Sequence, residues 1–476
     1  MKRLFLIVFL FIFFCHDEVT ASHLRGGYIY TEVSSSATLT FKVHLVLMTD
    51  MGSSVFGGGG EIDFGDGTVL SDLAIQTEVI DSERQLAINS VVIEHTYQAP
   101  GSYIISYSEK GRNAGVLNIS NSVDTPFYIE TTILIDPFLG SNSNPNILNP
   151  SFTNWFTGTS GHFNLAALDP DGDSLSYRLG IPRQSKDKTV VEYTKPDNAI
   201  FYGTEYSTGN EEKNDIPKFE LDPISGDLIW DAPGAEGEYT ALVIVDEWRW
   251  VQGERYKTGT ASFDIQMIVE EDEVLKPTIV FPENQCYQEN SIVEELFQID
   301  GHTPVKVNLH TDAEGAKINN IPIEEYDFDL WKNSYDLTFT YDSKNAAQEY
   351  YKIVLSLEQE SLTGPNYFWS KAFVFGFGCD EILRAPVIVT SLSPVESRLR
   401  TNAYLTHSSG RISITMFEAD KVDFQLFDLN GKSLVKEKIS LFEGKGQVRY
   451  DPIPSGIYIA FLEIESHLYK QKVIVR

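Results

Sequence analysis

Short alternations of apolar and polar residues recur along the whole chain. In residues 38–45 every second side chain is Leu, Phe or Val, and residues 424–429 form a similar run. A period of two residues is typical of a half-buried β-strand. Gly, Asn, Asp and Pro separate these runs, and no segment keeps a helical period over three turns. The pattern predicts an all-β protein made of tandem β-sandwich (Ig-like) domains.

The chain has 476 residues, more than one hydrophobic core supports, so we expect several domains. An Asn-, Ser- and Pro-rich linker at residues 139–151 separates the first two sandwiches. The predicted parts are a signal peptide at 1–21, module 1 at 22–136, module 2 at 137–270, module 3 at 271–385 and a C-terminal domain at 386–476.

The first residues have the three parts of a cleavable secretory signal. Lys2 and Arg3 form a basic start, residues 4–14 are an apolar run, and residues 19–21 offer a cleavage site after Ala21. The run is too short to cross a bilayer as a stable helix. The alternatives are a permanent N-terminal anchor and lipidation of Cys15, against which the bulky residue before it argues. We therefore expect export and a mature chain without a transmembrane helix.

The charge and the cysteine count narrow the class of protein further. The formal net charge of -31 argues against nucleic acid as a partner, because phosphate binding needs a basic face. It also leaves carboxylates available for divalent cations. Without the signal, Cys286 and Cys379 remain, and in an oxidising compartment they predict one disulfide. This bond would close a loop of roughly ninety residues and stabilise module 3 by about 4 kcal/mol. Two buried free thiols are the alternative.

Two motifs in module 1 carry a family resemblance. Residues 62–68 read Ile-Asp-Phe-Gly-Asp-Gly-Thr, and residues 94–103 contain His-Thr-Tyr followed by Gly-Ser-Tyr. Together they resemble the PKD domain, a β-sandwich in which these positions are mainly structural. The resemblance implies that Asp63, Asp66 and His95 hold turns and a corner rather than perform catalysis.

Module 2 contains three segments in a recognisable order, at residues 163–177, 219–230 and 237–246. They resemble the Asp-x-Asp-Gly-Asp turn, the hairpin ending in Trp and the closing strand of cadherin-like and Ig-like modules of bacterial surface proteins. This resemblance again implies a β-sandwich with a role in binding or spacing.

The turn in module 2 brings Asp169, Asp171 and Asp173 together around Gly172. Three carboxylates repel one another unless a cation lies between them, and Ca²⁺ takes six to eight oxygen ligands. Asp246, at the end of the closing strand, could add a further ligand. An EF-hand is excluded because the glycine precedes the third aspartate. The hypotheses are therefore a calcium site and, alternatively, a solvated polar turn.

The strand that follows Asp246 carries Trp248 and Trp250 at alternate positions, with Tyr256 shortly after. Buried, the tryptophans would belong to the sandwich core, which is our expectation. Exposed, they and Tyr256 would form a ligand-binding surface that stacks on sugar rings or on a protein partner. In module 3, which carries no recognised family motif, we expect Trp331 and Trp369 in the core.

The C-terminal domain has four characteristic pieces. They are Ser393-Pro394-Val395, the Asn-Gly-Lys hairpin within residues 424–432, the Pro-Ser-Gly-Ile-Tyr turn within 454–460 and the Lys-containing closing strand at 469–476. The set resembles the type A C-terminal sorting domain of the type IX secretion system of Bacteroidetes-type bacteria. The resemblance implies the type IX machinery as a partner and a secreted or outer-surface location. A plain β-sandwich without a targeting role is the alternative.

The sequence shows no catalytic motif. It lacks His-Glu-x-x-His, Gly-x-Ser-x-Gly and any Cys/His cluster with zinc spacing. We expect a non-enzymatic protein that acts in adhesion or binding, with a polysaccharide, a cell or a protein as its partner. The alternative is a secreted hydrolase with its site in residues 137–385, in module 3 or in the insertion at residues 186–214.

Overall fold

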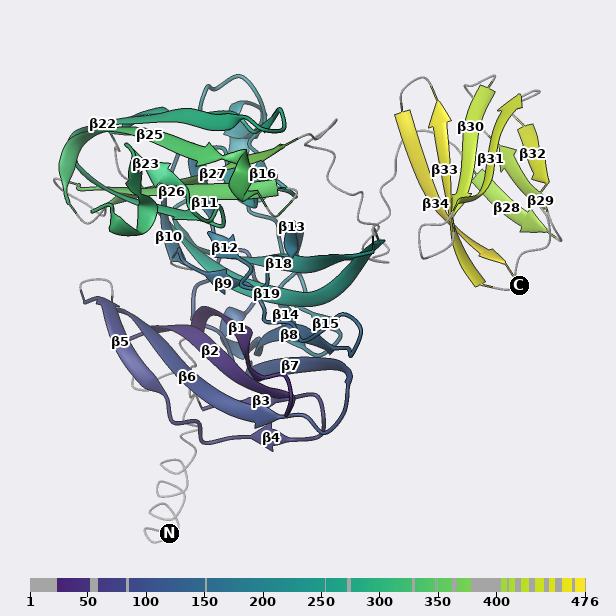
Figure 1. The fold of residues 1–476 in the computed structure, drawn as a ribbon, viewed down its shortest axis with the longest axis horizontal. Helices are drawn as coiled ribbons and strands as arrows, with labels where there is room; N and C mark the ends of the chain where they lie inside the picture. Colours follow the sequence, from purple (N-terminus) through teal and green to yellow (C-terminus); the bar gives the residue numbers. More distant parts are fainter. Residues whose placement is uncertain are drawn as a thin grey trace, which may run out of the picture. The chain divides into compact units, whose positions relative to one another are not determined.

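The computed structural model divides into two compact units, Met1–Ile388 and Val389–Arg476, which we describe separately (Figure 1). In the first unit it describes residues 24–51, 59–82, 85–149, 152–252, 254–271, 275–327, 330–346, 348, 350–361 and 366–377, and in the second the strands given below. The predicted signal peptide, Cys379 and residues 393–395 lie outside the described residues. Among the described residues, no helix has the length and apolar character needed to cross a membrane.

A sheet of 14 strands runs through modules 1 and 2 of the first unit. Its strands are β1 (Leu24–Ser35), β2 (Thr40–Asp50), β3 (Glu61–Asp63), β4 (Val69–Leu70), β5 (Gln76–Asp81), β6 (Leu86–Thr96), β7 (Gly101–Glu109), β8 (Phe127–Ile135), β10 (Phe152–Phe156), β13 (Ser174–Gly180), β14 (Arg183–Ser185), β15 (Lys188–Thr189), β18 (Gly237–Val251) and β19 (Glu254–Glu270).

Modules 1 and 2 share this sheet, because β19 of module 2 lies between β8 and β1 of module 1 (Figure 1). Gly27 is in register with Asp264. A Cβ atom on the neighbouring Gly26 would lie 2.4 Å from the Asp264 carbonyl oxygen, so the close approach of the two strands requires glycine. Arg112 of module 1 is buried and pairs with the Asp264 carboxylate at 2.6 Å. The two modules are therefore joined by backbone pairing and by a buried ion pair.

The motif residues of module 1 hold the turn between β3 and β4. The Asp63 carboxylate accepts a hydrogen bond from the Gly65 amide at 2.8 Å, and the Asp66 carboxylate accepts one from the Thr68 amide at 2.9 Å. His95 Nε2 lies 2.8 Å from the second oxygen of Asp66. Asp63, Asp66 and His95 thus have the structural role that the sequence led us to expect.

Module 2 closes its sandwich with two small sheets. They consist of β11 (Gly161–Asn164), β17 (Asp227–Trp230) and β16 (Phe219–Leu221), and of β9 (Asn146–Ile147) and β12 (Ala167–Leu168). The short 3-10 helices of modules 1 and 2 are η1 (Ser122–Asp124), η2 (Ala199–Phe201) and η3 (Gly203–Thr208). Trp155 and Trp230 pack in the core between these small sheets and β18–β19, with their ring centroids 5.8 Å apart.

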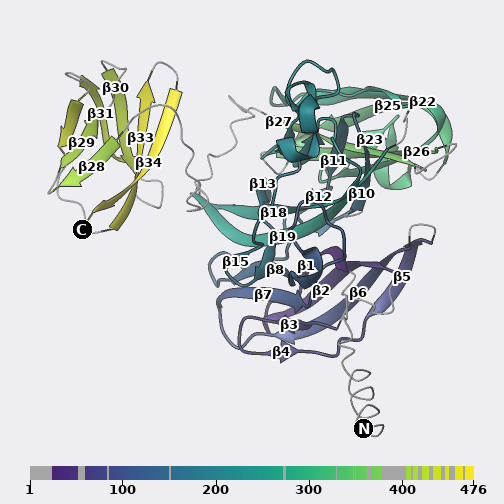
Figure 2. The same ribbon diagram turned by 180° about the vertical axis from the view of Figure 1, so that it is seen from behind.

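Module 3 is built on a sheet of eight strands. The elements are β20 (Thr278–Val280), β21 (Gln285–Tyr287), β22 (Ile292–Thr311), β23 (Lys317–Ile318), β24 (Ile321–Pro322), β25 (Lys332–Asp342), β26 (Tyr350–Gln359), β27 (Tyr367–Phe377) and the 3-10 helices η4 (Ile323–Glu325) and η5 (Ser343–Asn345). Strand β27 packs against β10 and β11 of module 2 (Figure 2).

The two tryptophans of module 3 have different environments. Trp369 is 6% exposed and lies in the core, as expected. Trp331 is 44% exposed, so the prediction that it belongs to the core is wrong. It directly precedes β25 and lies outside the alternation that buries every second residue of that strand.

The second unit has two sheets. One consists of β28 (Tyr404–Ser408), β29 (Arg411–Thr415) and β32 (Lys445–Arg449), and the other of β31 (Ser433–Ser440), β30 (Lys421–Phe427), β33 (Gly456–Ile464) and β34 (His467–Val475). Phe424 and Leu426 of β30 are fully buried. With the first unit, this arrangement confirms the predicted all-β fold of tandem β-sandwiches.

Candidate ligand-binding site

The predicted ligand residues lie on the hairpin of β18 and β19, whose register decides which side chains share a face. Trp248 is paired with Lys257, and Trp250 with Arg255. Residues directly opposite each other in an antiparallel pair point to the same side of the sheet. We call the outer face formed by these four residues the tryptophan face.

The tryptophan face is accessible to solvent. Trp250 is 51% exposed, and Trp248 is partly buried. The Trp248 indole Nε1 donates to the Ser176 hydroxyl at 2.8 Å, and the Arg255 guanidinium lies 5.0 Å from the Trp248 ring centroid. The expectation that both tryptophans belong to the sandwich core is therefore wrong. The core of module 2 uses the alternate positions of β18, such as Val243 and Val245.

Tyr256 lies on the other face of the hairpin, because it is paired with Arg249. Its ring makes an edge contact with Phe138, with a centroid distance of 6.5 Å. The structure thus brings Trp248 and Trp250 together and separates Tyr256 from them. The register of the two strands decides which β19 residue shares a face with the tryptophans. This register depends on the turn and on a bulge between Glu247 and Trp248, and a sequence pattern reveals neither feature.

Asp246 lies at the inner end of the tryptophan face and binds two cationic side chains. Its carboxylate accepts from Lys257 Nζ at 2.6 Å and from Arg178 Nε at 3.1 Å. Burial acts to raise the pKa of Asp246, but the hydrogen bond and charge of Lys257 and the charge of Arg178 lower it overall. Asp246 is therefore an anionic anchor that fixes Lys257 and Arg178 on this face.

Two of the three aspartates of the module 2 turn, Asp171 and Asp173, pair with a guanidinium on the opposite face. Asp169 Oδ1 accepts hydrogen bonds from the amides of Asp171 and Asp173 at 2.9 and 3.0 Å. Arg249 donates to both carboxylate oxygens of Asp173 at 2.8 Å and lies 3.4 Å from Asp171. Arg249 thus supplies positive charge between the carboxylates.

Asp246 is separated from this group, because successive side chains along β18 point to opposite faces and Asp246 points away from the face of Glu247 and Arg249. Within the described part of the chain, no group of three or more His, Cys, Asp or Glu residues is arranged to hold a metal ion. Calcium binding by Asp169, Asp171, Asp173 and Asp246 stays a prediction.

The sequence did not single out Glu247, which is fully buried behind the hairpin. Its carboxylate accepts hydrogen bonds from Asn142 Nδ2 at 2.5 Å and from Asn144 Nδ2 at 2.8 Å. Burial raises its pKa well above the ordinary value, and the charge of Asp169 adds to this effect. Both asparagines belong to the linker at 139–151, so the linker is fixed to the base of the hairpin.

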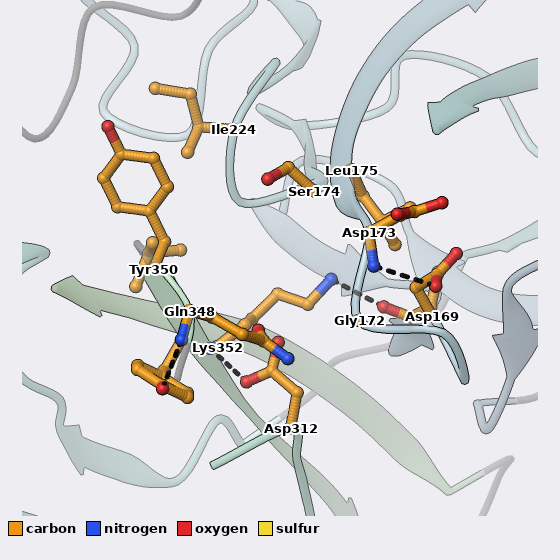
Figure 3. A pocket seen from close by; sticks show the side chains of 13 residues that line it. Asp169, Gly172, Asp173, Ser174, Leu175, Ile224, Asp312, Gln348, Tyr350 and Lys352 are labelled. Atoms are coloured by element: carbon orange, nitrogen blue, oxygen red, sulfur yellow. Dashed lines mark hydrogen bonds between the residues drawn. The ribbon is translucent and has the colours of Figure 1, made fainter. Parts of the chain in front are cut away.

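A small cavity lies beside the Asp169 turn, where modules 2 and 3 meet (Figure 3). Its volume is about 70 Å³, and its walls include Asp169, Asp312 and Lys352. Lys352 reaches from β26 and donates to the Ala167 carbonyl at 2.7 Å and to the Tyr177 hydroxyl. Lys352 therefore forms a lysine clamp between the two modules at the wall of the cavity.

Burial shifts the pKa values of these three wall residues. It raises the pKa of Asp169 to about 7, an effect to which the charges of Asp173 and Asp171 add. It raises the pKa of Asp312 to about 6 and lowers that of Lys352 to about 8. These groups are the chemically unusual side chains that a hydrolase in residues 137–385 would use.

Comparison with protein families identifies the C-terminal domain. Residues 408–476 match the family described as the secretion system C-terminal sorting domain. This match confirms the predicted type IX sorting domain and, with it, the secretion machinery as a partner. It indicates export, with an outer-surface or secreted location. No curated protein matches the sequence.

Among solved structures, the chain resembles multidomain β-sandwich proteins at a low level. Three consecutive Ig domains of titin share 10% identity over 71% of this chain and 91% of that chain, with a TM-score of 0.14. The first three extracellular cadherin domains of mouse protocadherin-24 share 10% identity over 65% and 91%, with a TM-score of 0.18. The sialic acid binding region of a Streptococcus sanguinis adhesin shares 12% over 63% and 96%, with a TM-score of 0.15. TM-scores this low support no further conclusion.

Proposed function

We propose that the chain is an exported binding protein that acts in adhesion, without catalysis of its own. Its ligand surface is the tryptophan face, and its partner is a polysaccharide, a cell or a surface protein. The observation that carries the proposal is the exposed Trp250 ring next to Trp248 on a sheet face. Exposed aromatic rings on a rigid element provide large contact areas at low entropic cost.

The second candidate function, a hydrolase, rests on the shifted pKa values around the cavity at Asp169, Asp312 and Lys352. Size argues against this candidate. Ligand pockets usually enclose roughly 300–1,000 Å³. The cavity of about 70 Å³ has room for a few water molecules but not for a sugar or a peptide residue.

A binding experiment with two matched tryptophan variants tests the proposal. The full chain and its Trp250→Ala and Trp331→Ala variants are applied to whole cells and to immobilised polysaccharides and proteins. Both tryptophans are about half exposed, but Trp331 lies in module 3. We expect Trp250→Ala to weaken binding at least about tenfold and Trp331→Ala to leave it unchanged. Equal behaviour of the two variants would contradict the site.

The same samples are tested on glycan and peptide hydrolase substrates. Turnover by the wild-type chain that is abolished by Asp312→Asn or Asp169→Asn would replace the adhesion proposal with the hydrolase. Absence of turnover together with binding that depends on Trp250 supports the adhesion proposal.

A further inference from the structure

The tryptophan face carries positive charge on a strongly acidic protein. The chain as a whole has a formal net charge of -31. On this face, however, Arg255 and Lys257 lie opposite the tryptophans, and Arg178 lies beside Asp246 on the neighbouring strand β13. Three cationic side chains thus accompany one carboxylate, and that carboxylate, Asp246, is fully buried.

The cationic groups keep donors available for a ligand. Asp246 binds one N–H of Lys257 and the Nε–H of Arg178. An ammonium group has three donors and a guanidinium has five. The side chains of Lys257 and Arg178 are 39% and 31% exposed, so part of each is open to solvent. Asp246 therefore holds two cations in place while leaving donors for an incoming anion.

The spacing of these groups suits a polymer of sugar units. Along a strand, alternate residues are about 7 Å apart, and side chains on paired strands are about 5 Å apart. A row of alternate positions along β18 contains Trp250, Trp248, Asp246 and Ile244, and Arg178 on β13 is paired with Ile244. These positions form a strip about 20 Å long. An extended chain of several sugar rings covers such a length, with apolar ring faces over tryptophan and acid groups beside cations.

We propose that the tryptophan face binds an acidic polysaccharide, with a sugar ring packed on Trp250 and sugar carboxylates paired with Lys257 and Arg178. This inference rests on the proposed function, which it narrows to one class of ligand. A neutral glycan would leave the cationic side chains unused, whereas an acidic protein segment would use them but would not need a flat aromatic surface.

The test compares two polymers that share a backbone and differ in charge. The full chain is titrated with polygalacturonate and with its fully methyl-esterified form at low salt and at 0.5 M NaCl. We expect binding to polygalacturonate at least about tenfold tighter than to the ester, with the difference reduced by salt because screening weakens exposed ion pairs.

Variants locate the site. We expect Trp250→Ala to weaken polygalacturonate binding at least about tenfold and Lys257→Gln about fivefold, whereas Lys257→Arg keeps the charge and the binding. Trp331→Ala and Lys344→Gln are matched controls, because both residues are exposed and lie in module 3. Thermal melting of each variant confirms that it folds.

The outcomes separate the inference from the proposed function. Equal binding of both polymers that still depends on Trp250 overturns the acidic ligand but leaves the proposed function standing. No binding to either polymer, with retained Trp250-dependent binding to proteins, also overturns the inference alone. If Trp250→Ala affects no binding of any kind, both fail.

Discussion

Replacement of Asp169 by asparagine removes one buried charge and keeps the hydrogen bonds of its turn. Oδ1 accepts the amides of Asp171 and Asp173, and an asparagine carbonyl oxygen accepts them equally well. The other oxygen, Oδ2, is buried and has no hydrogen-bond partner among the described residues. The side-chain NH2 group of the asparagine therefore takes the place of Oδ2, and no hydrogen bond to the described residues is lost.

The expected gain in stability depends on pH. Burial raises the pKa of Asp169 from 3.8 to about 7, so the unfolded chain releases this proton at lower pH than the folded chain does. Wild-type stability is therefore lost progressively as the pH rises from about 4 to about 7. At 1.36 kcal/mol per pKa unit, Asp169→Asn should stabilise the fold by about 2 kcal/mol at pH 5 and about 4 kcal/mol at pH 8.

Urea unfolding followed by tryptophan fluorescence measures this difference, because all six tryptophans lie in the first unit. Asp222→Asn is the control: Asp222 Oδ1 also accepts two backbone amides, but the residue is exposed, so we expect a change below about 0.5 kcal/mol. The measurements are made in chelator. A variant that is no more stable than the wild type at pH 8, or a gain that does not change with pH, would refute the reasoning.

The wild-type chain and the Asp169→Asn variant also test the predicted calcium site. If the Asp169 turn binds Ca²⁺, addition of calcium raises the unfolding midpoint of the wild type, and Asp169→Asn abolishes that gain because a charged ligand is lost. If calcium has no effect on the wild type, the predicted calcium site is wrong and Arg249 alone balances the carboxylates of the turn.

Three further predictions concern the clamp, the disulfide and the export route. Lys352→Met leaves two buried acceptors without their donor and should destabilise the first unit by about 3 kcal/mol in urea unfolding; a loss below about 1 kcal/mol would contradict the clamp. Cys286→Ser should cost about 4 kcal/mol, and non-reducing peptide mass spectrometry of the wild type should show Cys286 linked to Cys379, so a free thiol there would disprove the bond. Deletion of residues 389–476 should retain the chain in the periplasm of its host, as judged by cell fractionation and surface labelling, and surface exposure of the truncated chain would contradict the role of the sorting domain.

Local patterns in the sequence predicted the strands and several side-chain roles. The alternation along β18 indicated that Trp248 and Trp250 share a face. The two motifs of module 1 predicted the structural role of Asp66 and His95. Such features depend on residues that are near in sequence, or on motifs that occur together in one known fold. The proposed disulfide has indirect support from the structure, since β21, which contains Cys286, pairs with β27, whose last residue, Phe377, lies two residues before Cys379.

Features that depend on pairing between distant strands could not be predicted. Nothing local to Gly27 indicates that it pairs with Asp264 across the boundary between modules 1 and 2. Glu247 and Arg249 are charged residues within a strand, and only the arrangement of the linker around them makes them anchors of the hairpin. Exposure of Trp250 likewise depends on the hairpin extending beyond the neighbouring strand β13, whose pairing with β18 ends at Trp248.

The anchors on both faces of the hairpin affect binding. Glu247 and Arg249 fix the linker from the side opposite the tryptophans, while Asp246 fixes two cations on the tryptophan face itself. A hairpin held from both sides loses little conformational freedom when a ligand binds, so more of the contact energy appears as affinity. Substitution of Arg249 should therefore weaken binding to the tryptophan face without any contact between Arg249 and the ligand, and it should do so by loosening the hairpin rather than by changing the charge of the binding surface.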